Sequence, residues 1–233
     1  MRILLNNRSL LKISGQDSEE FIQNQFTNDL EKLDYTKVQI NAYCQHQGKI
    51  IGLFWVMRYQ NGFLISFPNE LIEKIKSRLE MFIIMSDVII ENVSSLYSQI
   101  GLINESNQSE FRINDKLALL IEDSTNQTDE LADNEATWDK ACFDSKLPEI
   151  YIKTSEKLVP QMLNLDINEI GVNFSKGCYP GQEVVARLHY LGSAKRRLFS
   201  FKADQEMQVG DSLYCSTSKT ALARGDRYKG SGI

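Results

Sequence analysis

The feature that most constrains the fold is a run of β structure between residues 37 and 67. Residues 50–59 form a long apolar stretch, Gln60, Asn61 and Gly62 have the composition of a hairpin turn, and apolar residues return over 63–67. A segment with apolar residues at helical spacing begins near Glu70, and residues 88–90 resume a strand pattern. The order strand, strand, helix, strand predicts an α+β fold that contains a ferredoxin-like unit.

The first thirty residues fit the same class. Residues 9–13 are strand-like, residues 14–17 provide a helix start, and Phe21, Ile22 and Phe26 follow at helical spacing. The apolar stripe of this helix is expected in the core. Its polar end, residues 25–29, is the part that could face a ligand.

The composition narrows the class of protein. The chain has 233 residues, 42% of them hydrophobic, and a net charge of -5, which argues against a protein that coats nucleic acid or an anionic membrane. No apolar run approaches the roughly 20 residues of a membrane span, so a cytoplasmic protein without a membrane partner is expected. The cysteines and histidines show no metal-ligand spacing, and no metal site is predicted; they are Cys44, Cys142, Cys178, Cys215, His46 and His189.

A loop that runs into a helix carries the strongest functional signal. The helix is expected over residues 182–188, and the residues of the loop and its first turn are Lys176, Gly177, Cys178, Tyr179, Pro180, Gly181, Gln182 and Glu183. A helix N-terminus and nearby cations stabilise a thiolate over a thiol, so Cys178 is a candidate reactive thiol. The alternative is that Cys178 is a buried small hydrophobe and the glycines only form a turn.

This stretch, KGCYPGQEVVAR over residues 176–187, resembles the signature of the YgfZ family. Proteins of that family are folate-binding relatives of the glycine-cleavage aminomethyltransferase and are linked to iron–sulfur cluster maintenance. The resemblance extends from about residue 10 to about residue 201. It implies an aminomethyltransferase-like folate-binding fold built of ferredoxin-like units, with tetrahydrofolate or a derivative as its cofactor.

The resemblance also implies site residues. The block that ends at Pro148 places Asp144 at the position of a glutamate that pairs with the pterin ring in the aminomethyltransferases, and the alternative is that Asp144 is a surface charge. Gln182, Glu183 and Arg187 are the other expected folate contacts. The acid positions used for one-carbon transfer are Ile51 and Gly52 here, and neither can move a proton, so aminomethyltransferase activity is not expected.

A basic stretch follows the signature. Residues 176–202 hold six Lys or Arg and one acid, a local charge of about +5, and Lys195, Arg196 and Arg197 form its densest part. The glutamate tail of a folate would suit this patch. A tRNA backbone is the rival ligand and a solvated strand end is the neutral alternative.

The sequence therefore predicts a folate-binding body over residues 1–195, with an acidic linker near 122–139, and a reduced C-terminal β element over 196–233. This element is expected as a small or incomplete β-barrel, with strands at residues 198–201 and 213–215. The predicted function is that of a folate-binding accessory protein for iron–sulfur cluster assembly or repair. It would contact an assembly or cluster-enzyme partner and affect tRNA modification indirectly. The alternatives are a folate-dependent one-carbon transferase and a direct tRNA-binding protein, the latter disfavoured by the net charge.

Overall fold

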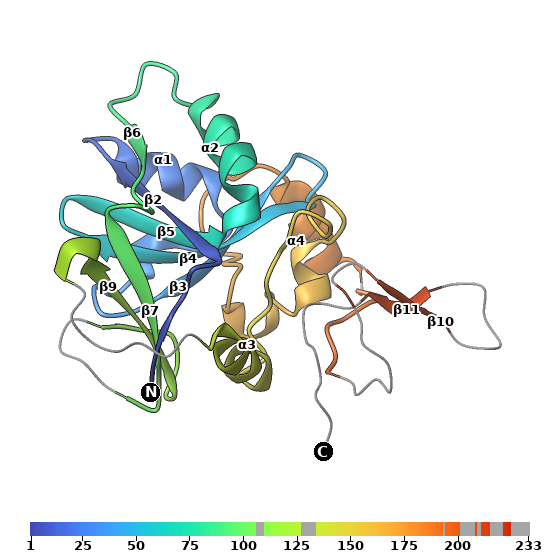
Figure 1. Cartoon of the computed structure of the whole chain (residues 1–233). Helices are drawn as coiled ribbons and strands as arrows, with labels where there is room; N and C mark the ends of the chain where they lie inside the picture. The colour runs from blue at the N-terminus through green and yellow to red at the C-terminus, as the bar shows by residue number, and fades with distance from the viewer. Residues whose placement is uncertain are drawn as a thin grey trace.

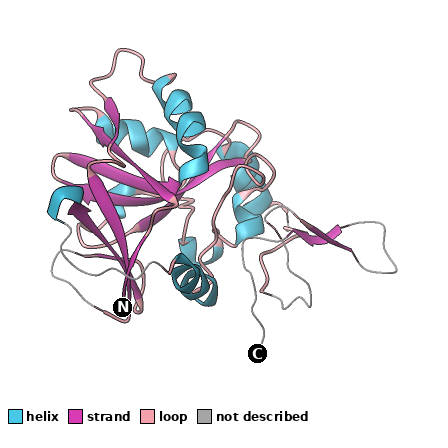
Figure 2. Ribbon diagram, viewed as in Figure 1, coloured by secondary structure: helices cyan, strands magenta, loops and turns pink. Residues whose placement is uncertain are grey.

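The computed structural model of the chain describes residues 1–105, 110–126, 134–192, 194–200, 208, 211–214 and 221–224. Antiparallel sheets and short helices make up the fold (Figures 1 and 2). The strands are β1 (Arg2–Leu4), β2 (Arg8–Ser14), β3 (Gln39–Cys44), β4 (Ile50–Tyr59), β5 (Gly62–Pro68), β6 (Ile89–Asn92), β7 (Tyr97–Ile103), β8 (Phe111–Arg112), β9 (Leu117–Asp123), β10 (Ser212–Tyr214) and β11 (Ala221–Arg224). The α-helices are α1 (Ser18–Gln25), α2 (Ile72–Glu80), α3 (Glu135–Asp144) and α4 (Gln182–Tyr190). Single 3-10 turns are η1 (Leu30–Lys32), η2 (Asn69–Leu71), η3 (Ser124–Asn126), η4 (Pro160–Leu163) and η5 (Ile167–Glu169).

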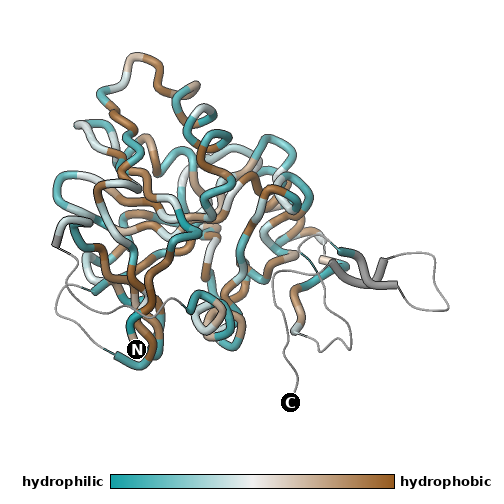
Figure 3. Tube along the Cα trace, viewed as in Figure 1, coloured by the Kyte–Doolittle hydropathy of each residue, from teal (hydrophilic) through white to brown (hydrophobic). Residues whose placement is uncertain are grey.

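Two sheets form the body. The larger has the strand order β3-β4-β5-β2-β6, and the smaller has the order β1-β7-β9-β8. Apolar residues follow the strands of both sheets (Figure 3), and the fully buried aromatic residues Phe26, Tyr43, Phe54 and Phe67 pack as neighbours in the core. The predicted α+β class is confirmed at this coarse level, because the fold is mixed and its sheets are antiparallel. The finer division into ferredoxin-like units stays a prediction.

Helix α3 packs on the smaller sheet through one large side chain. Trp138 is buried, and its ring lies directly over Gly101 in β7, where an added Cβ would stand 2.5 Å from the ring. Glycine at position 101 is therefore what lets this helix approach the strand. The helix occupies part of the segment predicted as an acidic linker: β9 runs to Asp123, and α3 starts at Glu135. Residues 127–133, the middle of that segment, lie outside the described residues.

The C-terminal part agrees with one predicted strand and departs from the other: β10 (Ser212–Tyr214) overlaps the strand predicted at residues 213–215. Residues 198–200, predicted as strand, form none, because Leu198 accepts a hydrogen bond from the Asn164 side chain (3.0 Å) and the segment runs along a cavity instead. The antiparallel pair β10–β11 extends away from the body (Figure 1). Cys215 and most of residues 201–233 lie outside the described residues, so the small barrel stays a prediction. Among the described residues, no helix is long and apolar enough to cross a membrane.

Candidate functional site

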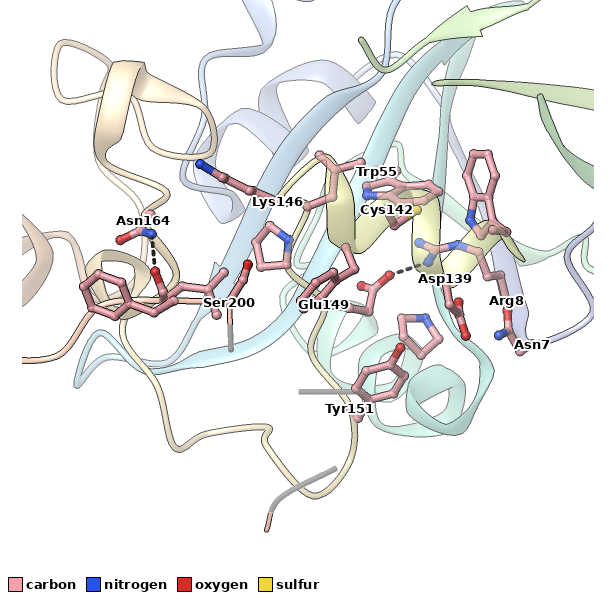
Figure 4. A pocket seen from close by; sticks show the side chains of 17 residues that line it. Asn7, Arg8, Trp55, Asp139, Cys142, Lys146, Glu149, Tyr151, Asn164 and Ser200 are labelled. Atoms are coloured by element: carbon pink, nitrogen blue, oxygen red, sulfur yellow. Dashed lines mark hydrogen bonds and ion pairs between the residues drawn. The ribbon is translucent and has the colours of Figure 1, made fainter. Parts of the chain in front are cut away.

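A cavity of about 460 Å³ lies between the larger sheet, α3 and residues 198–200 (Figure 4). Such a volume suits a small organic ligand. Its walls carry Trp55 from β4 and Trp138 from α3, whose rings meet edge to face with their centroids 6.1 Å apart. Apolar and aromatic residues dominate the rest of the lining, which includes Phe143, Leu147, Tyr151 and Phe199.

One cation in the wall is fixed by the strands around it. The Arg8 guanidinium lies 3.8 Å from the centroid of the Trp55 ring, and it donates to the Ser66 hydroxyl (2.9 Å) and the Ser66 carbonyl (3.1 Å). The Ser66 hydroxyl in turn donates to Gln99 of the smaller sheet (2.5 Å), whose amide donates to the Arg8 carbonyl (3.1 Å). This buried network joins the two sheets and holds the Arg8 side chain by several hydrogen bonds.

Arg8 holds a carboxylate in the cavity. Its Nη1 donates to Oε2 of Glu149, and the two side chains are only 6% and 13% exposed. Burial raises the pKa of the Glu149 carboxyl, against the opposing effects of Arg8 and the Ile150 N–H. The second oxygen, Oε1, is buried and has no hydrogen-bond partner among the described residues.

Two further polar atoms on residues of the lining are also buried without a hydrogen-bond partner among the described residues. The Trp55 Nε1 donor and the Asn164 Oδ1 acceptor are buried, and the described part of the chain offers neither a partner. A buried polar group without a partner costs about 1–3 kcal/mol. Three such atoms on residues that line one cavity indicate a place where a ligand completes the hydrogen bonding.

The signature loop lies elsewhere, against the turn between β3 and β4. Gly181 has a left-handed φ of +82°, and an added Cβ there would stand 2.4 Å from the Gln45 carbonyl oxygen. Tyr179 is buried, whereas Cys178 is exposed. The loop therefore anchors its neighbours in the body and presents the thiol outward. Cys178 is not among the residues that line the cavity.

Lys176 does not face the thiol. Its ammonium group donates to three backbone carbonyls at the end of α1, those of Gln23 (2.6 Å), Phe26 (2.7 Å) and Asn28 (2.8 Å). Burial lowers the pKa of Lys176 to about 8, with Asp29 opposing that shift. The polar residues after α1 also bind backbone: Thr27 donates to the Gly171 carbonyl (2.5 Å). This segment, which the sequence suggests could face a ligand, ties α1 to the chain before the signature.

The predicted folate contacts do not gather at the cavity. Asp144 is exposed and forms an ion pair with Lys140 one turn earlier in α3 (2.9 Å). Gln182 donates to the Gly177 carbonyl (3.3 Å) inside the loop, and Glu183 and Arg187 are exposed on α4. None of these four residues lines the cavity.

The basic patch is split. Lys195 and Arg196 are exposed, but Arg197 forms a two-pronged ion pair with Asp166 (2.5 and 3.0 Å) and donates to the Gln161 carbonyl (3.0 Å). Arg197 is thus occupied in fixing residues 194–200 to η4. At the acid positions, Ile51 is fully buried, and an added Cβ on Gly52 would meet Phe54 and Ile75.

Four residues of the cavity were not predicted as site residues from the sequence: Arg8, Trp55, Trp138 and Glu149. A buried arginine or glutamate has no signature in a single sequence, because burial depends on partners from distant segments. The one signal was position: Trp138 and Glu149 flank the block around Pro148 that the family resemblance singles out.

Comparison with known proteins shows which proteins this chain resembles. No family model matches the chain. An uncharacterized protein of Haemophilus influenzae is 27% identical over 219 residues, covering 91% of this chain and 77% of its own length. The tRNA-modifying protein YgfZ of Colwellia psychrerythraea is 29% identical (88% and 72% covered), and that of Vibrio vulnificus is 25% identical (98% and 77%).

A solved structure resembles the chain at the level of the fold. The glycine cleavage system aminomethyltransferase T of Bartonella henselae matches with a TM-score of 0.56 at 10% identity, over 81% of this chain. The chain spans 63% of the length of that enzyme. The relatives and the signature loop agree: over most of its length, the chain is similar to the YgfZ proteins.

Proposed function

We propose that this chain is a folate-binding accessory protein for iron–sulfur cluster assembly or repair, and that tetrahydrofolate or a derivative occupies the cavity between Trp55 and Trp138. The observation that carries the proposal is a set of three buried polar atoms on residues that line this cavity, to which the described residues offer no hydrogen-bond partner. Both donor and acceptor are among them, which fits a heterocycle that has N–H groups beside ring nitrogens and a carbonyl.

The fold supports the ligand class. The chain shares the architecture of an aminomethyltransferase of the glycine cleavage system, and the cavity has the size and aromatic walls of a small-molecule site. Folate provides a flat heterocycle and a benzoyl ring for such walls. The apolar surroundings of Ile51 and Gly52 supply no acid for transfer chemistry, so binding without aminomethyl transfer is the function proposed.

The link to iron–sulfur clusters rests on the signature loop. The loop presents Cys178 to solvent, where a partner of the cluster machinery can reach it. The YgfZ relatives are named tRNA-modifying proteins. We propose that any effect on tRNA is indirect, through cluster enzymes that modify it, because the net charge of -5 and the engagement of Arg197 by Asp166 do not favour a tRNA backbone.

Tryptophan fluorescence offers a direct test, because the only two tryptophans of the chain, Trp55 and Trp138, both line the cavity. Anaerobic titration with tetrahydrofolate should quench this fluorescence to saturation, and calorimetry should give the same midpoint. N-acetyltryptophanamide corrects for absorption by the ligand. p-Aminobenzoylglutamate, which lacks the heterocycle, should bind more weakly. A linear, unsaturable signal with no heat of binding would refute folate binding.

A further inference from the structure

We infer that Glu149 and Trp55 hold the heterocyclic end of the ligand, with Glu149 Oε1 accepting an N–H of the ring and Trp55 Nε1 donating to a ring acceptor. This inference rests on the proposed function. It replaces Asp144, the carboxylate that the sequence pattern selects, with a carboxylate five residues later in the chain.

Glu149 is set up to accept because Arg8 takes only one of its oxygens. Arg8 Nη1 donates to Oε2, and the remaining bonds of the guanidinium go to Ser66, so the orientation of the carboxylate is fixed from behind. Oε1 is left buried, and the described part of the chain gives it no partner. A ligand N–H that reaches Oε1 removes the cost of that unpaired acceptor.

Trp55 complements this acceptor with a donor. Its Nε1 is buried and has no hydrogen-bond partner among the residues that the structure describes. The Arg8 guanidinium lies over the Trp55 ring and also donates to Glu149, so Trp55 and Glu149 contact the same cation. The 2-amino-4-oxo edge of a pterin carries N–H groups and a carbonyl oxygen side by side, so one ring can satisfy both residues. Asp144, exposed and paired with Lys140, offers neither burial nor a free orientation.

The position of the ring sets the direction of the rest of the ligand. Figure 4 shows Glu149 and Arg8 apart from Asn164 and Ser200, with Lys146 extending on the side of Asn164. Asp139 adds a second carboxylate near Glu149 and raises the pKa of Glu149 further. Ligand carboxylates are disfavoured beside these acids, so the glutamate end of a folate extends toward Asn164 and Lys146.

Three variants test the assignment by calorimetry with tetrahydrofolate. Glu149→Gln should weaken binding by about 10-fold or more, because the only amide oxygen turns to Arg8 and an NH₂ group then faces the donors of the ligand. Trp55→Phe keeps a ring and removes the N–H, and a loss of about fivefold is expected. Asp144→Asn is the matched carboxylate-to-amide control and should bind within about twofold of the parent protein.

A ligand analogue separates a direct contact from a general loss of structure. The 2-desamino analogue of tetrahydrofolate should bind the parent protein more weakly than tetrahydrofolate does, and this difference should shrink in Glu149→Gln. Thermal unfolding checks that each variant is folded. If Glu149→Gln does not fold, Trp55→Phe and the analogue measured on the parent protein decide.

The outcomes distinguish the two proposals. No binding of tetrahydrofolate by the parent protein overturns the proposed function itself. Binding by the parent with undiminished affinity in both Glu149→Gln and Trp55→Phe overturns the inference and leaves the proposed function standing. A loss confined to Asp144→Asn would return the pterin contact to Asp144.

Discussion

Gly177 and Gly181 stand four residues apart in the signature loop, and only one of them needs to be glycine for the fold. Gly181 has φ +82° and packs against the Gln45 carbonyl and Gly48, whereas a Cβ on Gly177 would meet no described atom within 4 Å. Gly181→Ala should therefore lower the free energy of unfolding by on the order of 1–3 kcal/mol. Gly177→Ala, the matched control, should stay within about 0.5 kcal/mol.

Urea unfolding of the two variants checks this contrast. Equal stabilities of Gly181→Ala and the parent protein would show that the loop relaxes around the new Cβ. A strongly destabilised Gly177→Ala would mean that the new Cβ meets other atoms, which would contradict the open space that the described residues leave at Gly177. The open space at Gly177 lies next to Cys178, so a partner can approach the thiol closely there.

At single residues, the sequence was informative about backbone and less so about side-chain partners. Pro180 and Gly181 mark the loop, and an N-terminus at Gln182 follows from them, as the structure has it. Asp144 was predicted as the pterin contact from its position relative to Pro148 in the family pattern. Only the fold shows that Asp144 pairs with Lys140 at the surface while Glu149 is buried against Arg8 from a strand 141 residues earlier.

At the scale of elements, Lys176 ties the end of α1 to the signature loop through three backbone carbonyls. Lys176→Met leaves these carbonyls without their donor and should destabilise the protein by about 1–3 kcal/mol at pH 7. The pKa of Lys176 is lowered from 10.5 to about 8 in the folded protein by burial. Between these values the unfolded chain binds more protons, so the contribution of Lys176 to stability rises with pH.

The measurement is the difference in unfolding free energy between the parent protein and Lys176→Met at several pH values. That difference should be flat below about pH 8, because the lysine is protonated in both states there, and it should grow toward pH 10.5. The contributions of the other titratable groups are common to both proteins and cancel in the difference. A difference that falls or stays constant above pH 8 would contradict the lowered pKa.

Elements with a strong periodic pattern were predictable and the others were not. The strand β2, the hairpin β4–β5, and the starts of α1 and α4 follow from apolar patterning and turn residues. Helix α3 was missed because its sequence is acidic and a single side chain, Trp138, is fully buried on it. Strands β1 and β8 have three and two residues, too few for a pattern, and are held by pairing with β7 and β9.

At the scale of the whole molecule, the cavity is a product of assembly. Its residues Arg8, Trp55, Trp138 and Glu149 come from two strands (β2 and β4), helix α3 and one loop. The hydrogen bonds of Arg8 through Ser66 and Gln99 join the two sheets behind it. No local pattern encodes such convergence. The family resemblance predicted a folate site, but it could not identify the residues that line the cavity of this chain.

The same assembly keeps the cavity and the signature thiol apart, because Cys178 is exposed on its loop and does not line the cavity. Cys178→Ala should therefore bind tetrahydrofolate within about twofold of the parent protein and unfold within about 0.5 kcal/mol of it. In bacterial cells that lack their own family member, the same variant should fail to restore the activity of iron–sulfur enzymes. Cys178→Ser tests whether the sulfur matters or only the shape, and it should fail as well. If Cys178→Ala fully restores these enzymes, the thiol is not required for the function. If Cys178→Ala also loses folate binding, the loop and the cavity act as one site.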